Sequence, residues 1–122
     1  MLFIDTPPYL STTLPQLFDL SDFIIVPTKA GIADLMAIRS TIAMITARSA
    51  NEKAFIVFNM IKPQTTLTDE ISKMLADFPV AVAKTQISDL VAFTRSFITS
   101  GVETKKRIHQ MDQLTEEILN LL

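Results

Sequence analysis

Apolar residues follow two spacings along this chain: short uninterrupted runs, and longer stretches in which they recur every three or four positions. Uninterrupted runs are typical of strands buried on both faces of a parallel sheet, and here they are Leu2–Asp5, Phe23–Val26, Ala54–Phe58 and Pro79–Val82. Helical spacing predicts helices in Ser11–Leu20, Ile32–Arg48, Ile71–Phe78, Leu90–Ile98 and Glu103–Leu122. The alternation of strands and helices predicts one α/β domain over residues 1–122, with a doubly wound, mostly parallel sheet and flanking helices.

The helical spacing also predicts which side chains face the interior. The expected apolar stripes are Leu35, Ile38, Ile42 and Ile45; Ile71, Met74, Leu75 and Phe78; and Met111, Leu114, Ile118 and Leu121. We interpret the six methionines as packing residues. The final helix is expected to pack onto the domain, with a helix–helix dimer contact as the alternative.

The first apolar run leads directly into a carboxylate and then into two prolines, Pro7 and Pro8. Because proline has no N–H to donate to a ladder, this strand must end at Asp5 or Thr6, and the next one is expected to stop at Pro27. Asp5 would then stand at the carboxyl end of a buried strand, the edge where open α/β sheets bind ligands. A carboxylate there can hold Mg²⁺ together with substrate phosphates, or it can simply begin a turn.

Composition narrows the class of protein. The chain has 122 residues, 48% of them hydrophobic, and a formal net charge of -2, which excludes a strongly cationic protein. It has no cysteine, so disulfides and thiolate metal sites are excluded. No apolar run is long enough for a membrane span and the N-terminus does not resemble a secretory signal, so we expect a cytoplasmic protein.

The number of glycines decides whether this sequence can contain a phosphate-binding loop. A phosphate-binding loop needs several glycines so that backbone N–H groups can approach the anion, and this chain has two, Gly31 and Gly101. The pattern G-x-x-x-x-G-K-[ST] is absent from the sequence.

The run Phe3–Pro8, with a strand that ends in Pro27-Thr28, resembles the ParA/MinD family of P-loop ATPases, which carry a deviant Walker A motif. The resemblance implies the C-terminal part of a ParA-like ATPase domain, an incomplete P-loop NTPase fold, with ATP and Mg²⁺ as cofactors. It assigns Asp5 as the Walker B magnesium residue. Thr6 and Pro7 would begin the switch that senses the γ-phosphate, so the implied catalytic set is Asp5, Thr6 and Pro7.

The resemblance also implies a nucleotide-binding group formed by Asn59, Met60, Ile87 and Ser88, beside the base. Asn59 has an alternative role, which is to satisfy backbone groups where its strand ends. Basic residues in the C-terminal part, Arg95, Lys105, Lys106 and Arg107, are the implied DNA contacts, although they also fit a solvated helix start. The last dozen residues contain no Lys or Arg, which disfavours an anionic membrane and favours the ParA branch over MinD.

In the family, the strand that feeds the phosphate loop lies between the strands matching Leu2–Asp5 and Phe23–Val26. Three explanations for its absence stay open: a truncated or fragmentary ATPase, direct pairing of the two strands, or a strand borrowed from a second copy. The implied function is plasmid or chromosome partition, or maintenance of a conjugative element. Its expected partners are a second copy, non-specific DNA and a partition adaptor protein.

A non-catalytic interaction or dimerisation module derived from the same fold is the competing hypothesis. Because the phosphate loop is absent, we expect this chain alone to be inactive as an ATPase and to bind nucleotide weakly or not at all.

Overall fold

A computed structural model describes residues 2–7, 9, 11–62, 67–89 and 105–120 of the chain. Its sheet contains β1 (Ile24–Thr28), β2 (Ala54–Phe58) and β3 (Ala81–Val82), in the order β1-β2-β3. Both pairings are parallel, with Val26 opposite Ile56 and Ile56 opposite Val82. The described residues therefore form a small parallel α/β sheet, as the alternation of strands and helices predicts.

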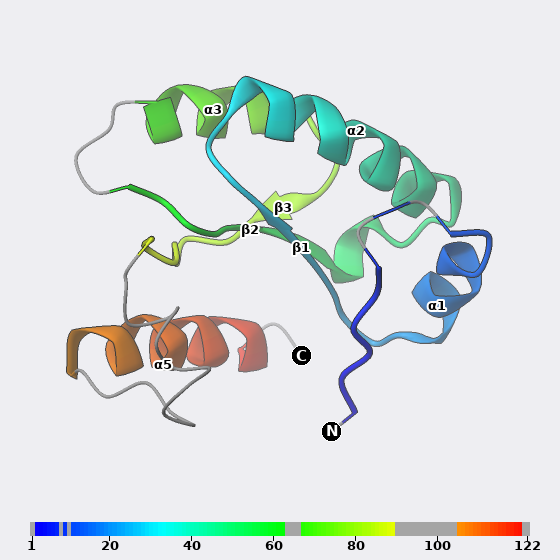
Figure 1. Cartoon of the computed structure of the whole chain (residues 1–122). Helices are drawn as coiled ribbons and strands as arrows, with labels where there is room; N and C mark the ends of the chain where they lie inside the picture. The colour runs from blue at the N-terminus through cyan, green and yellow to red at the C-terminus, as the bar shows by residue number, and fades with distance from the viewer. Residues whose placement is uncertain (1, 8, 10, 63–66, 90–104, 121–122) are drawn as a thin grey trace.

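Helices cover the sheet from two sides (Figure 1). α2 (Ile32–Ala47) follows β1 and α3 (Leu67–Leu75) follows β2, and both lie on one face, while α5 (Lys105–Leu119) lies on the other. The short α1 (Leu14–Leu20) precedes β1, and a single 3-10 turn, Asn51–Lys53, precedes β2. Pro15 stands in the first turn of α1, where its missing N–H costs no helical hydrogen bond.

The main core lies between the sheet and α2. Alternate residues of β1 and β2, including Val26, Ile56 and Phe58, are buried on the face toward this helix. The predicted stripe of α2 is confirmed in full, because its buried residues are Leu35, Ile38, Ile42 and Ile45. Complete burial of one such side chain stabilises the fold by roughly 1.5–3 kcal/mol.

β1 runs through Pro27 to Thr28, so the stop at Pro27 predicted from its missing N–H is wrong, whereas the end at Pro27-Thr28 used in the family resemblance is confirmed. The Thr28 carbonyl accepts a hydrogen bond of 2.7 Å from the Asn59 N–H, which directs the backbone groups of Thr28 toward β2. In a parallel ladder, adjacent residues of a strand direct their backbone N–H and C=O groups to opposite sides. Pro27 therefore faces the edge of β1 that no described strand occupies, and its missing N–H breaks no hydrogen bond of the sheet.

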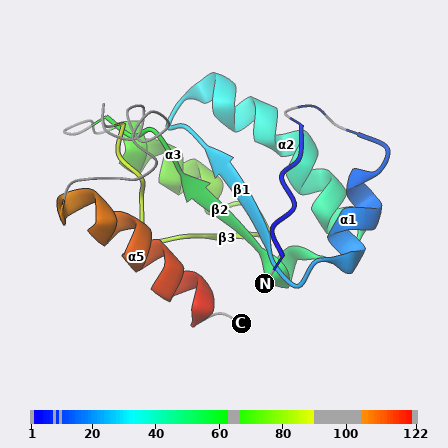
Figure 2. The same ribbon diagram turned by 60° about the horizontal axis from the view of Figure 1, so that its bottom comes forward.

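The predicted strand Leu2–Asp5 is also wrong. Residues 2–7 form no helix or strand, and the exposed fractions of Leu2, Phe3 and Ile4 are 84%, 80% and 56%. This segment lies on the side of β1 away from β2, as Figures 1 and 2 both show, but it forms no ladder with a described strand. An apolar run becomes a buried strand only where it finds a ladder partner and helices that cover it, and this segment has neither among the described residues. Asp5 therefore does not stand at the end of a buried strand.

Several other packing predictions need correction. Met36, Met60, Met74 and Met111 are exposed, so methionine is not a general core residue here; Met44 does pack against the core. In α3, Ile71 and Leu75 are buried as predicted. The helix ends at Leu75 and not at Phe78, and Phe78 lies in the following turn, partly buried against the core. The predicted helix from Leu90 to Ile98 and the residue Leu121 lie outside the described residues.

Candidate functional site

The carboxyl edge of the sheet brings together the four residues predicted to bind the nucleotide. Asn59 and Met60 directly follow β2. The Ile87 N–H donates to the Phe58 carbonyl at 2.9 Å, and the Ile61 N–H donates to the Ile87 carbonyl at 3.0 Å. A parallel bridge between Ile61 and Ser88 continues this pairing. The segment Ile87–Ser88 therefore lies beside the end of β2, although the two are nearly thirty positions apart in sequence.

The side-chain oxygen of Asn59 accepts a hydrogen bond from the backbone of the next residue. The Met60 N–H donates to Asn59 Oδ1 at 2.9 Å. Met60 has a φ of 55°, a left-handed conformation that costs a non-glycine residue on the order of 1–2 kcal/mol. The hydrogen bond offsets part of this cost, which supports the role of Asn59 at a strand terminus. Its NH₂ group is the part of the amide that has donors to offer to a ligand.

Ser88 is held by α5. The Ser88 N–H donates to Gln110 Oε1 at 3.2 Å, and Gln110 Nε2 donates to Ser88 Oγ at 2.9 Å. Ile87 beside it is buried, so its side chain serves packing. Gln110 was missed by the sequence analysis, because nothing in its local pattern indicates which distant backbone group it meets.

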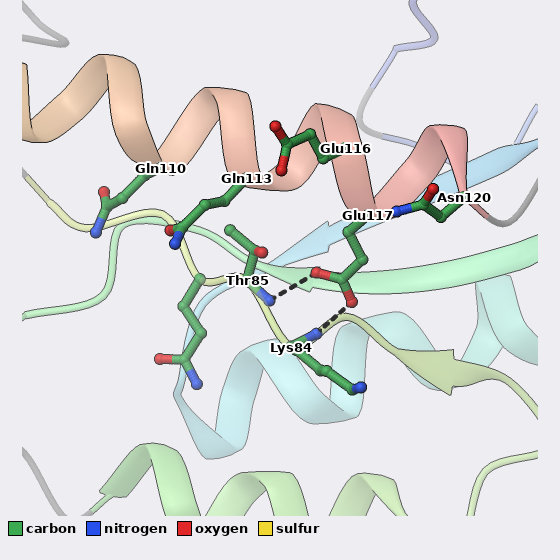
Figure 3. Close-up of a pocket in the computed structure, with 8 residues that line it drawn as sticks. Lys84, Thr85, Gln110, Gln113, Glu116, Glu117 and Asn120 are labelled. Carbon is green, nitrogen blue, oxygen red and sulfur yellow. Dashed lines mark hydrogen bonds between the residues drawn. The ribbon is translucent and has the colours of Figure 1, made fainter.

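Glu117, also on α5, binds the same segment a few residues before Ser88. Its two carboxylate oxygens accept hydrogen bonds from the backbone N–H groups of Lys84 and Thr85, as Figure 3 shows. The N···O distances are 2.7 Å for Lys84 and 2.9 Å for Thr85. Burial alone raises the pKa of Glu117, but these hydrogen bonds and the nearby Lys84 ammonium together outweigh it. The pKa of Glu117 is therefore lower than that of an ordinary glutamate. Gln110 and Glu117 are seven positions apart, so they share one face of α5, and that spacing was the available sequence signal.

An open groove of about 620 Å³ lies between α5 and the segment after β3 (Figure 3). It is lined by polar and charged residues, Lys84, Thr85, Gln86, Gln110, Gln113, Glu116, Glu117 and Asn120, whose polar and apolar atoms contribute about equally. It contains neither a nucleophile paired with a base nor a cluster of metal ligands among the described residues.

Asp5, Thr6 and Pro7 are exposed and irregular, and no hydrogen bond or ion pair joins them to the Asn59 group within the described part of the chain. The described residues also contain no group of three or more His, Cys, Asp or Glu side chains that could hold a metal ion. Mg²⁺ requires octahedral coordination by oxygen, so a single carboxylate is insufficient. These residues alone do not fit a complete magnesium site.

The predicted DNA contacts are only partly placed. The backbone of Lys105, Lys106 and Arg107 forms the first turn of α5, while their side chains and all of Arg95 lie outside the described residues. None of the helices described is both long and apolar enough to cross a membrane.

Comparison with known proteins gives one informative similarity. No family model matches the chain. The chain is similar to the ParA family protein MG470 of Mycoplasma genitalium, with 27% identity over 140 aligned residues. The alignment includes 97% of this chain and 49% of the relative, so the chain spans about half the length of that protein. Since nearly the whole chain aligns, the similarity is not limited to one short motif.

Proposed function

We propose that this chain is the C-terminal part of a ParA-like ATPase domain, of the P-loop type with a deviant Walker A motif, that acts in DNA partition. The observation that carries the proposal is the similarity to a ParA family protein along 97% of the chain. The parallel order β1-β2-β3 is compatible with such a domain. The succession Asp5, Thr6, Pro7 and Pro8 supplies the motif on which the family resemblance rests.

In this proposal the chain provides part of an ATP site and not all of it. Asp5 would supply one oxygen ligand to a Mg²⁺ bound with ATP, and Thr6 and Pro7 would form the start of the segment that senses the γ-phosphate. The Asn59 NH₂ group and the backbone near Ile87 and Ser88, which lie side by side, would contact the base. The sequence contains no glycine-rich phosphate loop, so the phosphate cradle has to come from another polypeptide segment.

A chimera tests this proposal. We expect that replacing the aligned half of the Mycoplasma genitalium protein with this chain gives an ATPase that requires Mg²⁺. Asp5→Asn in the chimera should lower kcat at least about tenfold, since losing even an outer-shell partner of a metal site costs that much. Asp22→Asn, which removes another exposed carboxylate, is the matched control.

The isolated chain should bind a fluorescent ATP analogue weakly or not at all, and micromolar affinity would contradict the incomplete-site interpretation. An Asp5→Asn chimera that hydrolyses ATP at the unchanged rate would contradict the role of Asp5.

The second candidate is a non-catalytic interaction module. The exposed apolar side chains of Leu2, Phe3 and Ile4 favour it, because such surfaces associate with other chains. They lie on the side of β1 with which no described strand pairs. A folded chimera without ATPase activity, together with self-association of this chain, would favour the module.

A further inference from the structure

The segment after β3 has two sets of backbone N–H groups with different acceptors. The first set donates to backbone carbonyls of β2 and of the residues that follow it, and it consists of Ala83, Ile87 and Asp89. The second set donates to side chains of α5, and it consists of Lys84, Thr85 and Ser88. The helix therefore supplies acceptors for N–H groups of this segment that β2 does not engage.

These acceptors belong to an element that contributes little to the main core. α2 buries four apolar side chains, whereas none of the described side chains of α5 is fully buried. Leu114 and Ile118, on the same face of α5 as Gln110 and Glu117, are only half-buried. The open groove runs along this helix (Figure 3). Elements with few buried apolar contacts open at a lower free energy than the core does.

The contact of α5 with Ser88 resembles the contact that a base would make. Gln110 Oε1 accepts a hydrogen bond from the Ser88 N–H at 3.2 Å, and Gln110 Nε2 donates to Ser88 Oγ at 2.9 Å. An acceptor beside an NH₂ donor is also the pattern that adenine presents with its N7 and N6 atoms. Gln110 therefore occupies the two atoms of Ser88 that could read such an edge.

We propose that α5 is a displaceable cover, which opens as one unit from the segment Lys84–Ser88 while the sheet, α2 and α3 stay folded. In the closed form Gln110 withholds the Ser88 N–H from ligands. Gln110 and Glu117 lie on one rigid helix, so weakening either contact loosens both. The opening involves no nucleotide, and only its consequence for a base rests on the proposed function.

Native-state hydrogen exchange, measured by NMR on this chain, tests the opening. The amides of Lys84, Thr85 and Ser88 should exchange through one common opening, with equal opening constants. Interior amides of α5 should share this constant, because a helix of 15 residues is marginal in water once it has undocked. The constant should be at least about tenfold larger than that of Ala83 and Ile87, the matched controls that donate to the β2 side.

A substitution at one contact should also be detected at the other. Glu117→Gln should raise the opening constant at Ser88, which is held by Gln110, by about fivefold, the equivalent of about one hydrogen bond. A carboxylate that served only Lys84 and Thr85 would leave Ser88 unchanged. Glu116→Gln removes a neighbouring charge from the same groove and should leave all these amides unchanged. Circular dichroism checks that both variants are folded.

Two exchange results would overturn the cover. If Lys84, Thr85 and Ser88 exchange as slowly as Ala83 and Ile87, α5 leaves only when the whole segment unfolds. If their three opening constants are unrelated, each N–H is released by a separate local motion.

The chimera described above tests the consequence for a base. Gln110→Ala should tighten binding of the fluorescent ATP analogue at least about threefold, because a ligand that needs the open form binds only the open fraction of the molecules. Unchanged or weaker binding would overturn the competition at Ser88. A chimera that binds no nucleotide would instead contradict the proposed function, and the exchange experiment, which uses no nucleotide, would still decide the cover.

Discussion

Glu117 is the residue whose role is most clearly defined by its contacts. Its carboxylate accepts hydrogen bonds from two consecutive backbone N–H groups, those of Lys84 and Thr85. These bonds connect α5 to the segment after β3. Backbone donors next to each other in an irregular segment would otherwise need water. A single side chain on the last described helix therefore orders the loop that leads to Ile87 and Ser88.

We expect Glu117→Gln to lower the free energy of unfolding by about 1 kcal/mol, because a neutral amide accepts these bonds less strongly and has one oxygen instead of two. Urea denaturation measures the change. Glu116→Gln is the matched control: its side chain is exposed and accepts no such pair of bonds among the described residues, so its effect should stay within about 0.5 kcal/mol.

The same contact predicts a pH dependence. The pKa of Glu117 is lower in the folded chain than in the unfolded one, where glutamate titrates near about 4.3. Its contribution is therefore complete above the unfolded pKa and disappears as the pH falls through the folded pKa. The stability difference between wild type and Glu117→Gln should be constant at neutral pH and vanish in acid. A difference that grows in acid would contradict the proposed contact.

At the scale of elements, α2 contributes more to the core than any other described helix. Its four buried residues recur at intervals of three and four and lie toward β1 and β2. α5 differs, because none of its described side chains is fully buried and its best-defined contacts are polar. The two helices should therefore respond differently to truncation of apolar residues.

We expect Ile45→Ala in α2 to lower the free energy of unfolding by about 2–5 kcal/mol, because this side chain is completely buried and its loss leaves a cavity. Ile32→Ala, at an exposed position of the same helix, should change it by less than about 0.5 kcal/mol. Chemical denaturation of both variants gives the comparison. Equal effects would mean that α2 does not present the face described here.

At the scale of the whole molecule, the formal net charge is -2, so binding to DNA needs a local group of cations. We expect the triple variant in which Lys105, Lys106 and Arg107 become alanine to bind DNA more weakly. The slope of log affinity against log salt should also become shallower by about 2 to 3, since each phosphate contact contributes about 0.9.

The control for DNA binding replaces Lys62, Lys73 and Lys84, which are exposed basic residues outside α5, with alanine and keeps the same change of net charge. Equal losses in the two triple variants would indicate a general charge effect. Binding that does not weaken with salt would contradict contacts to phosphate.

The sequence by itself indicated the four described helices, although not all of their ends, together with the strand Ala54–Phe58 and the buried stripe of α2. Each depends on neighbouring residues: apolar spacing, a proline in the first turn of a helix, or an uninterrupted apolar run. It also brought Asn59, Met60, Ile87 and Ser88 into one candidate group, through a family resemblance, and the structure places these residues side by side at the carboxyl edge of the sheet.

Only the tertiary structure decided the environment of Leu2–Asp5, the position of Pro27 and the partners of Glu117. Whether an apolar run becomes a buried strand depends on a neighbouring ladder, and whether proline is tolerated depends on which edge is open. Glu117 meets backbone groups more than thirty positions away. Such contacts join segments that are remote in sequence, so no local pattern contains them.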